Sequence, residues 1–239
     1  MELNDLLKMY EEKKKQHKDE AYLHVSEIFE EARERYKSEY LSSPRAARLR
    51  AQGRTPDAEQ SWKPFKGTNF EKLVLYIIRQ ELESMGLRCV PGGKLLRPKN
   101  LPLELSDVYH KLVVRYGQYS ILPDADLVIY EPESHDVIGI VSCKTTLRER
   151  IAQTAYWKLK LSQDPVTKHI KGYFITADED RDLVRGLNSP QVSRNRIIVE
   201  HELDGTYVFH DVEESEKVKP FPKFIADLRK IVNTGKKHG

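Results

Sequence analysis

The sequence predicts an α/β protein that begins with a helical region, residues 1–66, and continues as an α/β core, residues 67–239. Apolar residues recur at helical spacing as far as residue 42. Two short β-branched segments bounded by turn residues follow at 125–130 and 137–143. A chain of 239 residues is long enough to bury a substantial hydrophobic core.

Composition narrows the class of protein further. Charged residues make up 32% of the chain and hydrophobic residues 39%, which is typical of a soluble globular protein. No apolar run approaches the roughly 18 to 20 residues of a membrane helix, and the N-terminus lacks the apolar segment of a signal peptide. Cys89 and Cys143 are too few for a disulfide framework, so we expect a cytoplasmic protein and exclude membrane, secreted and fibrous classes. The 40 basic and 37 acidic residues give a net charge of only +3, which by itself does not indicate a nucleic-acid partner.

Two helices are expected within residues 1–42. Their apolar positions are Leu3, Leu6, Leu7 and Tyr10 in the first helix, and Tyr22, Val25, Ile28, Phe29, Ala32 and Tyr36 in the second. Ser42-Ser43-Pro44 ends the second helix, because proline disfavours helical geometry in the residue before it.

Residues 45–66 differ in charge from the helices before them. The segment contains Arg45, Arg48, Arg50, Arg54, Lys63 and Lys66, and its acids are Asp57 and Glu59. Glycine and proline interrupt it, which is typical of a linker. A basic linker and an arm that contacts phosphates are both compatible with this pattern.

The first part of the core is expected to contain two helices and a β-hairpin. Thr68 or Asn69 would cap the first helix, which carries an apolar stripe. A short helix over 106–115 precedes the segments 125–130 and 137–143, and a turn rich in proline, serine and aspartate joins these two strands into a hairpin.

The remaining core continues to alternate between helical and strand patterns. The expected elements are a helix over 147–161 capped by Thr145 or Thr146, a buried strand over 172–177, a second hairpin formed by 196–202 and 206–210, and a final helix over 222–232. The Asp204-Gly205 turn is the basis for the second hairpin.

Candidate catalytic residues lie at the strand ends of the first predicted hairpin. Asp124 and Asp126 lie at the start of one strand and, being two residues apart, point to the same side of it. Lys144 ends the next strand, and hairpin pairing would bring the two strand ends close together. Glu71 lies in the first turn of the helix that opens the core, and Arg148-Glu149-Arg150 follows Lys144 at a helix start.

Carboxylates beside a lysine suit the hydrolysis of a phosphodiester. Carboxylate oxygens are ligands that Mg²⁺ prefers, the metal polarises the phosphate and lowers the pKa of its water, and the lysine stabilises negative charge. Asp124 is favoured as the metal ligand because it follows a proline. Asp126 directly precedes the apolar strand and stays an alternative.

Pro123-Asp124 on one strand and Ser142-Cys143-Lys144 on the next resemble the PD-(D/E)xK nuclease fold, over about residues 67–210. The resemblance implies that Asp124 binds Mg²⁺ and that Lys144 lies beside the attacked phosphate. It also implies that Glu71, from the preceding helix, completes the acidic cluster as a second metal ligand.

A narrower resemblance covers the segment Ser142-Cys143-Lys144-Thr145-Thr146-Leu147-Arg148-Glu149-Arg150. It is similar to the type II restriction endonucleases that recognise CCGG or CCNGG, the BsaWI-like group. These enzymes carry an Arg-Asp/Glu-Arg element at a fixed offset from the lysine. The resemblance implies that Arg148, Glu149 and Arg150 read adjacent C·G pairs, and the chemistry agrees, since arginine donates to guanine O6 and N7 and a carboxylate accepts from cytosine N4.

The chain departs from this family in its acidic residues. Ser142 stands where the general motif has aspartate or glutamate. The family compensates with a glutamate on the following helix, but the corresponding positions here are Trp157 and Lys158. The remaining candidates are Glu71 and Asp124 as metal ligands, with Asp126 and Ser142 as catalytic helpers. One metal ion and two are both compatible with this set.

Local charge supports contact with double-stranded DNA. Residues 144–171 contain seven bases and two acids, a local charge of +5, so we expect the duplex along this segment. A palindromic target implies a homodimer with one active site for each strand. Tyr156 and Trp157 are expected to pack against the sheet or a second subunit, and the polar residues 189–196 to form a loop or contact DNA.

These residues together predict a Mg²⁺-dependent type II restriction endonuclease that cleaves at a palindromic site containing CCGG or CCNGG. Two alternatives stay open. One is a nuclease of the same fold that reads DNA structure, such as a junction resolvase or repair nuclease. The other is a non-catalytic DNA-binding module, which the missing third carboxylate keeps open.

Overall fold

The computed structural model describes residues 1–235, apart from the side chains of Asp19, Arg148 and Glu149 and those of residues 232–235. The chain forms two compact units, of which the first ends at Tyr76 and the second begins at Ile77. Both positions lie inside helix α4 (Ala58–Ser84), as does the predicted boundary after residue 66, which stays a prediction. Within the described part, no helix combines the length and the apolar composition needed to cross a bilayer.

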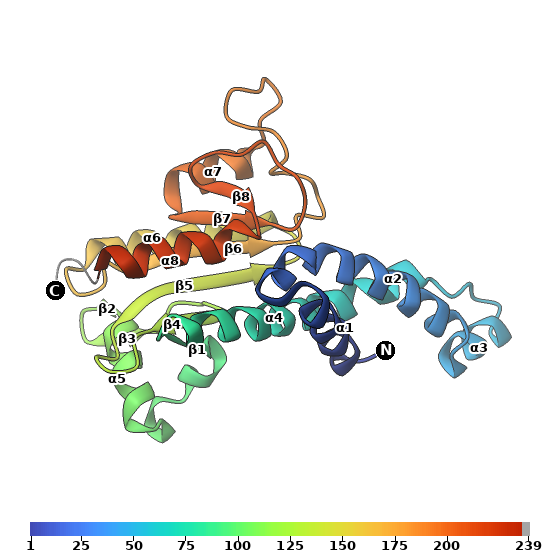
Figure 1. The fold of residues 1–239 in the computed structure, drawn as a ribbon, viewed down its shortest axis with the longest axis horizontal. Helices are drawn as coiled ribbons and strands as arrows, with labels where there is room; N and C mark the ends of the chain where they lie inside the picture. The colour runs from blue at the N-terminus through green and yellow to red at the C-terminus, as the bar shows by residue number, and fades with distance from the viewer. Residues whose placement is uncertain (236–239) are drawn as a thin grey trace. The chain divides into compact units, whose positions relative to one another are not determined.

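The first unit is helical, as the sequence predicts. It contains α1 (Leu3–His17), a 3-10 segment (Lys18–His24), α2 (Val25–Leu41), α3 (Pro44–Ala51) and the first part of α4 (Figure 1). The predicted apolar positions Leu6, Tyr10, Val25, Ile28, Phe29 and Ala32 are buried. The rings of Phe29 and Phe70 lie 5.6 Å apart between centroids, which packs α2 against α4.

The interpretation of residues 45–66 as a linker is wrong, because most of the segment is helical. α3 begins at Pro44, whose fixed φ suits the first helical position. The Ser43 side chain caps this helix by accepting a hydrogen bond from the Ala46 N–H at 3.2 Å.

The predicted start of a helix at Thr68 or Asn69 is also wrong. Both residues lie inside α4, which continues through Pro64. Asp57 supplies the cap instead, because its Oδ1 accepts from the Gln60 N–H at 2.9 Å just before the first turns.

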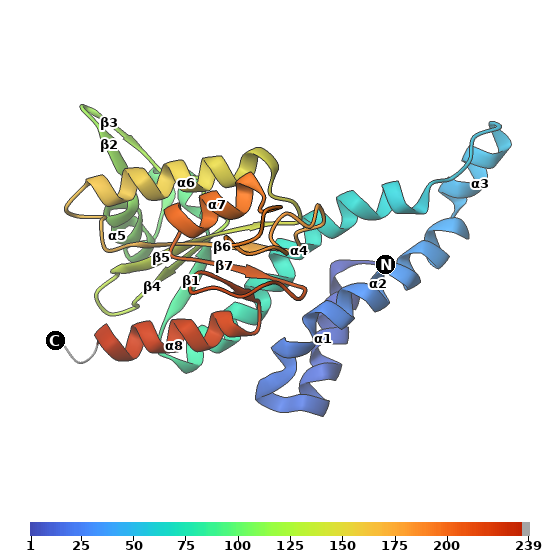
Figure 2. The same cartoon turned by 90° about the horizontal axis from the view of Figure 1, so that it is seen from above.

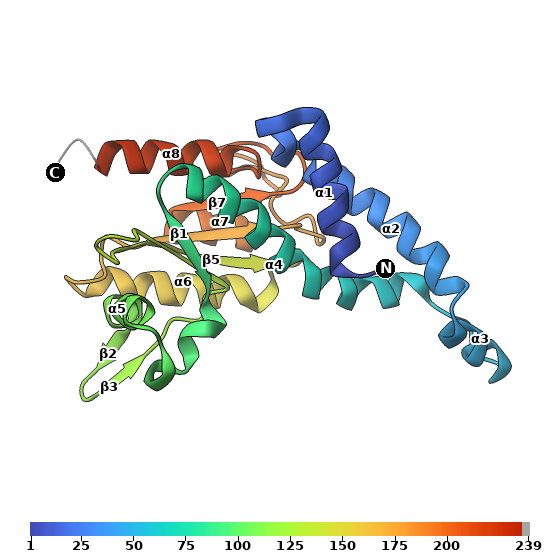
Figure 3. The same cartoon turned by 60° about the horizontal axis from the view of Figure 1, so that its bottom comes forward.

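The second unit is built on a six-stranded mixed sheet with the order β1-β4-β5-β6-β7-β8. Its strands are β1 (Arg88–Pro91), β4 (Leu127–Tyr130), β5 (Val137–Lys144), β6 (Lys171–Thr176), β7 (Gly205–Val208) and β8 (Val218–Pro220). β1, β4 and β5 pair antiparallel, and β5 through β8 pair parallel. The predicted first hairpin is confirmed as β4–β5, with Leu127 opposite Val141. A separate two-stranded sheet, β2 (Val114–Tyr116) and β3 (Tyr119–Ile121), precedes it (Figure 3).

Helices cover both faces of the large sheet. α5 (Leu103–Leu112), α6 (Arg148–Gln163) and α7 (Arg194–Glu202) lie on one face, and α8 (Lys223–Gly235) lies on the other (Figure 2). Phe174 of β6 belongs to the core cluster that includes Ile151 of α6. The neighbouring Tyr173 faces α8 instead, with its ring centroid 5.7 Å from that of Phe224. This alternation is the ordinary periodicity of a strand.

Most of the other predicted elements are confirmed with small shifts at their ends. They are the helices predicted over 106–115, 147–161 and 222–232, now α5, α6 and α8, and the strand predicted over 172–177, now β6. The cap expected from Thr145 or Thr146 is wrong, because Leu147 precedes α6 and makes no side-chain cap.

The second predicted hairpin, 196–202 with 206–210, is wrong. Its first half is helix α7, and β7 lies parallel to both β6 and β8. The β-branched run 197–199 favoured a strand by intrinsic propensity, but Ser193 caps a helix by accepting from the Arg196 N–H at 2.9 Å. Burial of the Arg196 side chain then overrides the propensity.

Candidate active site

Asp126 and Lys144 meet where β4 begins and β5 ends. The Asp126 N–H donates to the Val141 carbonyl at 3.0 Å, which fixes the chain just before β4. The Asp126 carboxylate accepts from the Cys143 N–H at 2.7 Å through Oδ2 and from Lys144 Nζ at 2.8 Å through Oδ1. The exposed fraction is 14% for the Asp126 side chain and 31% for Lys144. The pair is therefore oriented by the backbone and still reachable from solvent.

Asp124 has a different set of contacts. Its Oδ2 accepts from Gln153 Nε2 on α6 at 2.6 Å, and the residue is exposed. Gln153 Oε1 in turn accepts from Arg150 Nη1 at 3.5 Å. Gln153 therefore joins an exposed carboxylate to an arginine of the predicted base-reading element.

Ser142 is a buried residue of β5 that holds α6 in place. Its exposed fraction is 5%, and its hydroxyl lies 3.1 Å from Thr154 Oγ1. The same Thr154 oxygen lies 3.1 Å from the Arg150 carbonyl. This arrangement positions the first turns of α6 beside the end of β5.

These side chains line one surface pocket. Its residues are Asp124, Asp126, Ser142, Lys144, Arg150, Gln153 and Thr154. The pocket thus brings together five predicted site residues and adds Gln153 and Thr154, which the sequence reasoning missed. A signal was available, because residues three and four positions after Arg150 share its face of a helix.

Three predicted residues are not placed in this pocket. Glu71 lies in α4 within the first compact unit, and its role stays a prediction. Arg148 and Glu149 begin α6, but their side chains lie outside the described residues.

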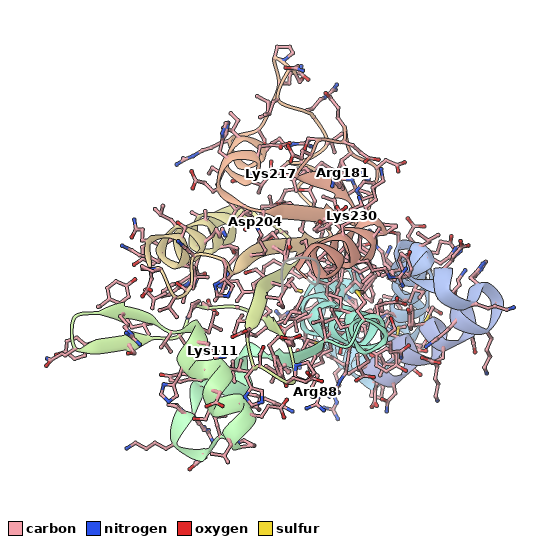
Figure 4. All side chains as sticks on the ribbon, turned by 60° about the vertical axis from the view of Figure 1, so that its left-hand side comes forward. Arg88, Lys111, Arg181, Asp204, Lys217 and Lys230 are labelled. Carbon is pink, nitrogen blue, oxygen red and sulfur yellow. The ribbon has the colours of Figure 1, made fainter. Side chains whose placement is uncertain are left out.

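The resembled family has a glutamate where this chain has Trp157 and Lys158, and these two residues contribute to packing and to an ion pair. Trp157 packs, partly buried, against the core cluster of the sheet, as predicted. Lys158 Nζ forms an ion pair with Asp204 at 2.7 Å, and Asp204 follows α7 (Figure 4). Burial opposes ionisation of Asp204, but hydrogen bonds from Lys158 and the Gly172 N–H hold its pKa below the usual range.

The chemistry of the pocket suits Mg²⁺. Among the side chains that the structure describes, no group of three His, Cys, Asp or Glu is arranged to hold a metal ion. Mg²⁺ requires fewer protein ligands, because it keeps several waters and is commonly held by one or two carboxylates. Asp124 and Asp126 supply two carboxylates on the wall of one pocket.

Asn195 and Arg196, in the first turn of α7, are hydrogen-bonded within the protein. Arg196 is fully buried and donates to the carbonyl oxygens of Leu183 at 2.6 Å and Glu213 at 2.7 Å. Asn195 Nδ2 donates to Asp182 Oδ2 at 2.6 Å. Arg196 therefore fixes the protein's own loops and has no free donor face for DNA.

Known proteins share sequence with most of the chain. The family model described as BsaWI restriction endonuclease type 2 matches residues 104–231, more than half of the chain. The chain is 38% identical over 220 residues to the "Putative type II restriction enzyme MjaVIP" of Methanocaldococcus jannaschii, covering 87% of this chain and 93% of that protein. It is 36% identical over 126 residues to the "Probable type II restriction enzyme HpyAORF263P" of Helicobacter pylori, covering 53% of this chain and 65% of that protein.

The fold agrees with these similarities. A solved structure of restriction endonuclease PspGI with substrate DNA matches with a TM-score of 0.56 and 17% identity, covering 98% of this chain and 94% of that one. The mixed sheet, with Asp126 and Lys144 at adjacent strand ends, defines a nuclease fold of the PD-(D/E)xK class. Within that class, the chain belongs to the BsaWI family of type II restriction endonucleases. The predicted fold class, family and enzyme class are thereby confirmed.

Proposed function

We propose that this protein is a Mg²⁺-dependent endonuclease that cleaves double-stranded DNA at a palindromic site containing CCGG or CCNGG. The observation that carries the proposal is the 2.8 Å contact between Asp126 and Lys144, in a pocket that Arg150 also lines. Support comes from two relatives named as type II restriction enzymes and from PspGI, which has a similar fold and was solved with its substrate DNA.

Asp126 is the principal metal ligand in this proposal, and Asp124 is the second. The sequence favoured the reverse order. The contacts favour Asp126, because the Cys143 N–H orients it against Lys144, whereas Asp124 is exposed and bonded to Gln153. Mg²⁺ held there would polarise a phosphate oxygen and lower the pKa of a bound water. Glu71 stays a candidate for a further ligand.

Lys144 is the residue that stabilises charge on the phosphate. Its ammonium has three donors, and the hydrogen bond to Asp126 occupies one of them. The others can donate to oxygens of a phosphate at the mouth of the pocket. Ser142 assists by fixing α6, and with it Arg150, beside Lys144.

Arg148, Glu149 and Arg150 read the C·G pairs in this proposal, through guanine O6 and N7 and cytosine N4. The local charge of +5 over residues 144–171 favours a duplex along this segment. Lys158 and Lys171 both pair with Asp204, so Lys160 and Lys168 are the bases of this segment that are left to neutralise backbone phosphates. A palindromic target has two-fold symmetry, which a homodimer with one pocket for each strand would match. We also propose that the enzyme acts in the cytoplasm.

Digestion of a plasmid of known sequence with Mg²⁺ tests the proposal. We expect discrete fragments whose sequenced ends map to one palindrome containing CCGG or CCNGG. Cleavage at branched or damaged sites without sequence-fixed ends would favour a structure-reading nuclease. Sequence-specific binding without cleavage at any Mg²⁺ concentration would favour a non-catalytic module.

A further inference from the structure

The first compact unit contains two kinds of arginine. On α2, Arg33 Nη2 donates to Glu59 at 2.6 Å and Arg35 Nε donates to Glu39 at 2.8 Å. α3 and the turn after it, residues 44–54, carry Arg45, Arg48, Arg50 and Arg54 and no acid. The α2 arginines are therefore neutralised by partners, while the later segment has a net charge of +4 from four arginines and no acid.

Nearby carboxylates do not neutralise the four arginines, which we call the α3 basic surface. Arg45, Arg48 and Arg54 form no ion pair within the part of the chain that the structure describes. Arg50 donates to the Leu41 carbonyl at 3.0 Å, which leaves its charge uncompensated. The acids that follow are engaged elsewhere, since Glu59 pairs with both Arg33 and Lys37 and Asp57 caps α4.

Packing does not explain why these residues are arginines. Ala46 is the buried residue of α3, and all four arginines are exposed. Like charges three or four residues apart on a helix repel each other, so Arg45 and Arg48 weaken the isolated helix. A bound polyanion would remove this repulsion.

Two of the four arginines also border one pocket. Arg45, near the start of α3, and Arg54, beyond its end, line the same open pocket of about 600 Å³ together with Leu49 and Asp57, whose carboxylate caps α4. Charges from both ends of the segment therefore face one region of the surface.

We propose that the α3 basic surface binds the phosphate backbone of DNA and contributes affinity that does not depend on base sequence. The proposal rests on the proposed function, because it takes DNA as the ligand. Guanidinium groups suit this role, since each presents a planar fork of donors that matches two phosphate oxygens. Between the two interpretations of residues 45–66, the structure therefore favours the phosphate-contacting arm, built as a helix.

The salt dependence of DNA affinity tests the proposal, using the full-length protein without divalent metal so that no cleavage occurs. The probes are a short duplex with a CCGG site and a scrambled duplex of equal length. The variant is Arg45→Gln/Arg48→Gln, and the matched control is Arg33→Gln/Arg35→Gln, which removes the same charge from paired positions. Thermal unfolding of each variant verifies that the fold is retained.

We expect the α3 variant to weaken binding to both duplexes equally and to lower the slope of log affinity against log salt by about 1.8. Its affinity would then fall about twelvefold less than that of wild type between about 50 and about 200 mM salt. The control should keep a slope close to wild type. Equal slopes for variant and control, or an effect limited to the CCGG duplex, would overturn the proposal while the proposed function stands. Absence of DNA binding by the wild-type protein would overturn both.

Discussion

Lys144 Nζ donates a hydrogen bond to Asp126 Oδ1 at 2.8 Å across the pairing of two neighbouring strands. The contact exists because β4 and β5 are antiparallel with Leu127 opposite Val141, so that the start of one strand adjoins the end of the other. The Cys143 N–H orients the same carboxylate. The geometry of this pocket therefore depends on strand register, because a slip of one residue would turn the side chains of the shifted strand to the opposite face of the sheet.

Replacement of Lys144 by alanine is expected to lower the single-turnover cleavage rate by at least about a hundredfold, because it removes a donor aimed at the developing charge. Site-specific binding measured by gel shift should be retained. Lys99→Ala, which removes an equal charge from an exposed position outside the segment 144–171, is the control. A cleavage rate for Lys144→Ala equal to that of Lys99→Ala would refute the assignment.

The two aspartates of the pocket are expected to differ in metal binding. Calorimetric titration with Ca²⁺, which avoids turnover, should show that Asp126→Asn loses the binding heat and that Asp124→Asn weakens it less. The reason is that Asp126 is the carboxylate oriented by the backbone. The opposite ranking would restore Asp124 as the principal ligand.

Loss of Arg150 is expected to reduce discrimination at one base pair by about 1 to 3 kcal/mol in competition binding with singly substituted duplexes. Arg148→Ala should act in the same way at a neighbouring pair. Arg185→Ala, at an exposed position of a loop, serves as the comparison. If Arg150→Ala lowers affinity equally for every duplex, Arg150 is a phosphate contact and the CCGG assignment fails.

The buried Arg196 is expected to be a main determinant of stability in the second unit. Arg196→Leu should lower the free energy of unfolding by about 3 to 5 kcal/mol, because it leaves the buried Glu200 charge without its partner. Urea denaturation is the measurement, and Arg194→Leu, at an exposed position in the same helix, is the matched control. Similar losses for the two variants would show that the internal hydrogen bonds of Arg196 contribute little.

His210 is expected to make stability depend on pH. Burial opposes its protonation, but the hydrogen bonds to Asp178 and to the Asp211 carbonyl outweigh this effect and raise its pKa above the usual 6.5. A raised folded-state pKa means that this stabilisation is fully present below about pH 6.5 and is lost as the pH rises through the higher value. The decrease in unfolding free energy that His210 causes as the pH rises should be absent in His210→Asn and present in His201→Asn. Identical pH profiles for wild type and His210→Asn would contradict the assignment.

Local patterns were sufficient for much of the fold and for the location of the chemistry. α1 and α2, the β4–β5 hairpin and α6 follow from side-chain periodicity, which is a local property. Lys144 and the aspartates before β4 could be associated from the sequence because a hairpin joins strands that are close along the chain. The small net charge, in contrast, concealed the difference between the paired arginines of α2 and the α3 basic surface.

Contacts between distant residues decided the rest. The run 197–199 has strand propensity, yet it is helical because Arg196 is buried among carbonyl oxygens that other segments supply. Contacts between distant residues also decided which aspartate of the pocket is held in a fixed orientation. A proline next to Asp124 favoured that residue, but the positions of Cys143, Lys144 and Gln153 make Asp126 the oriented carboxylate. Periodicity specifies which side of a strand or helix a residue occupies, whereas its partners depend on how the elements pack, and only the tertiary structure contains that information.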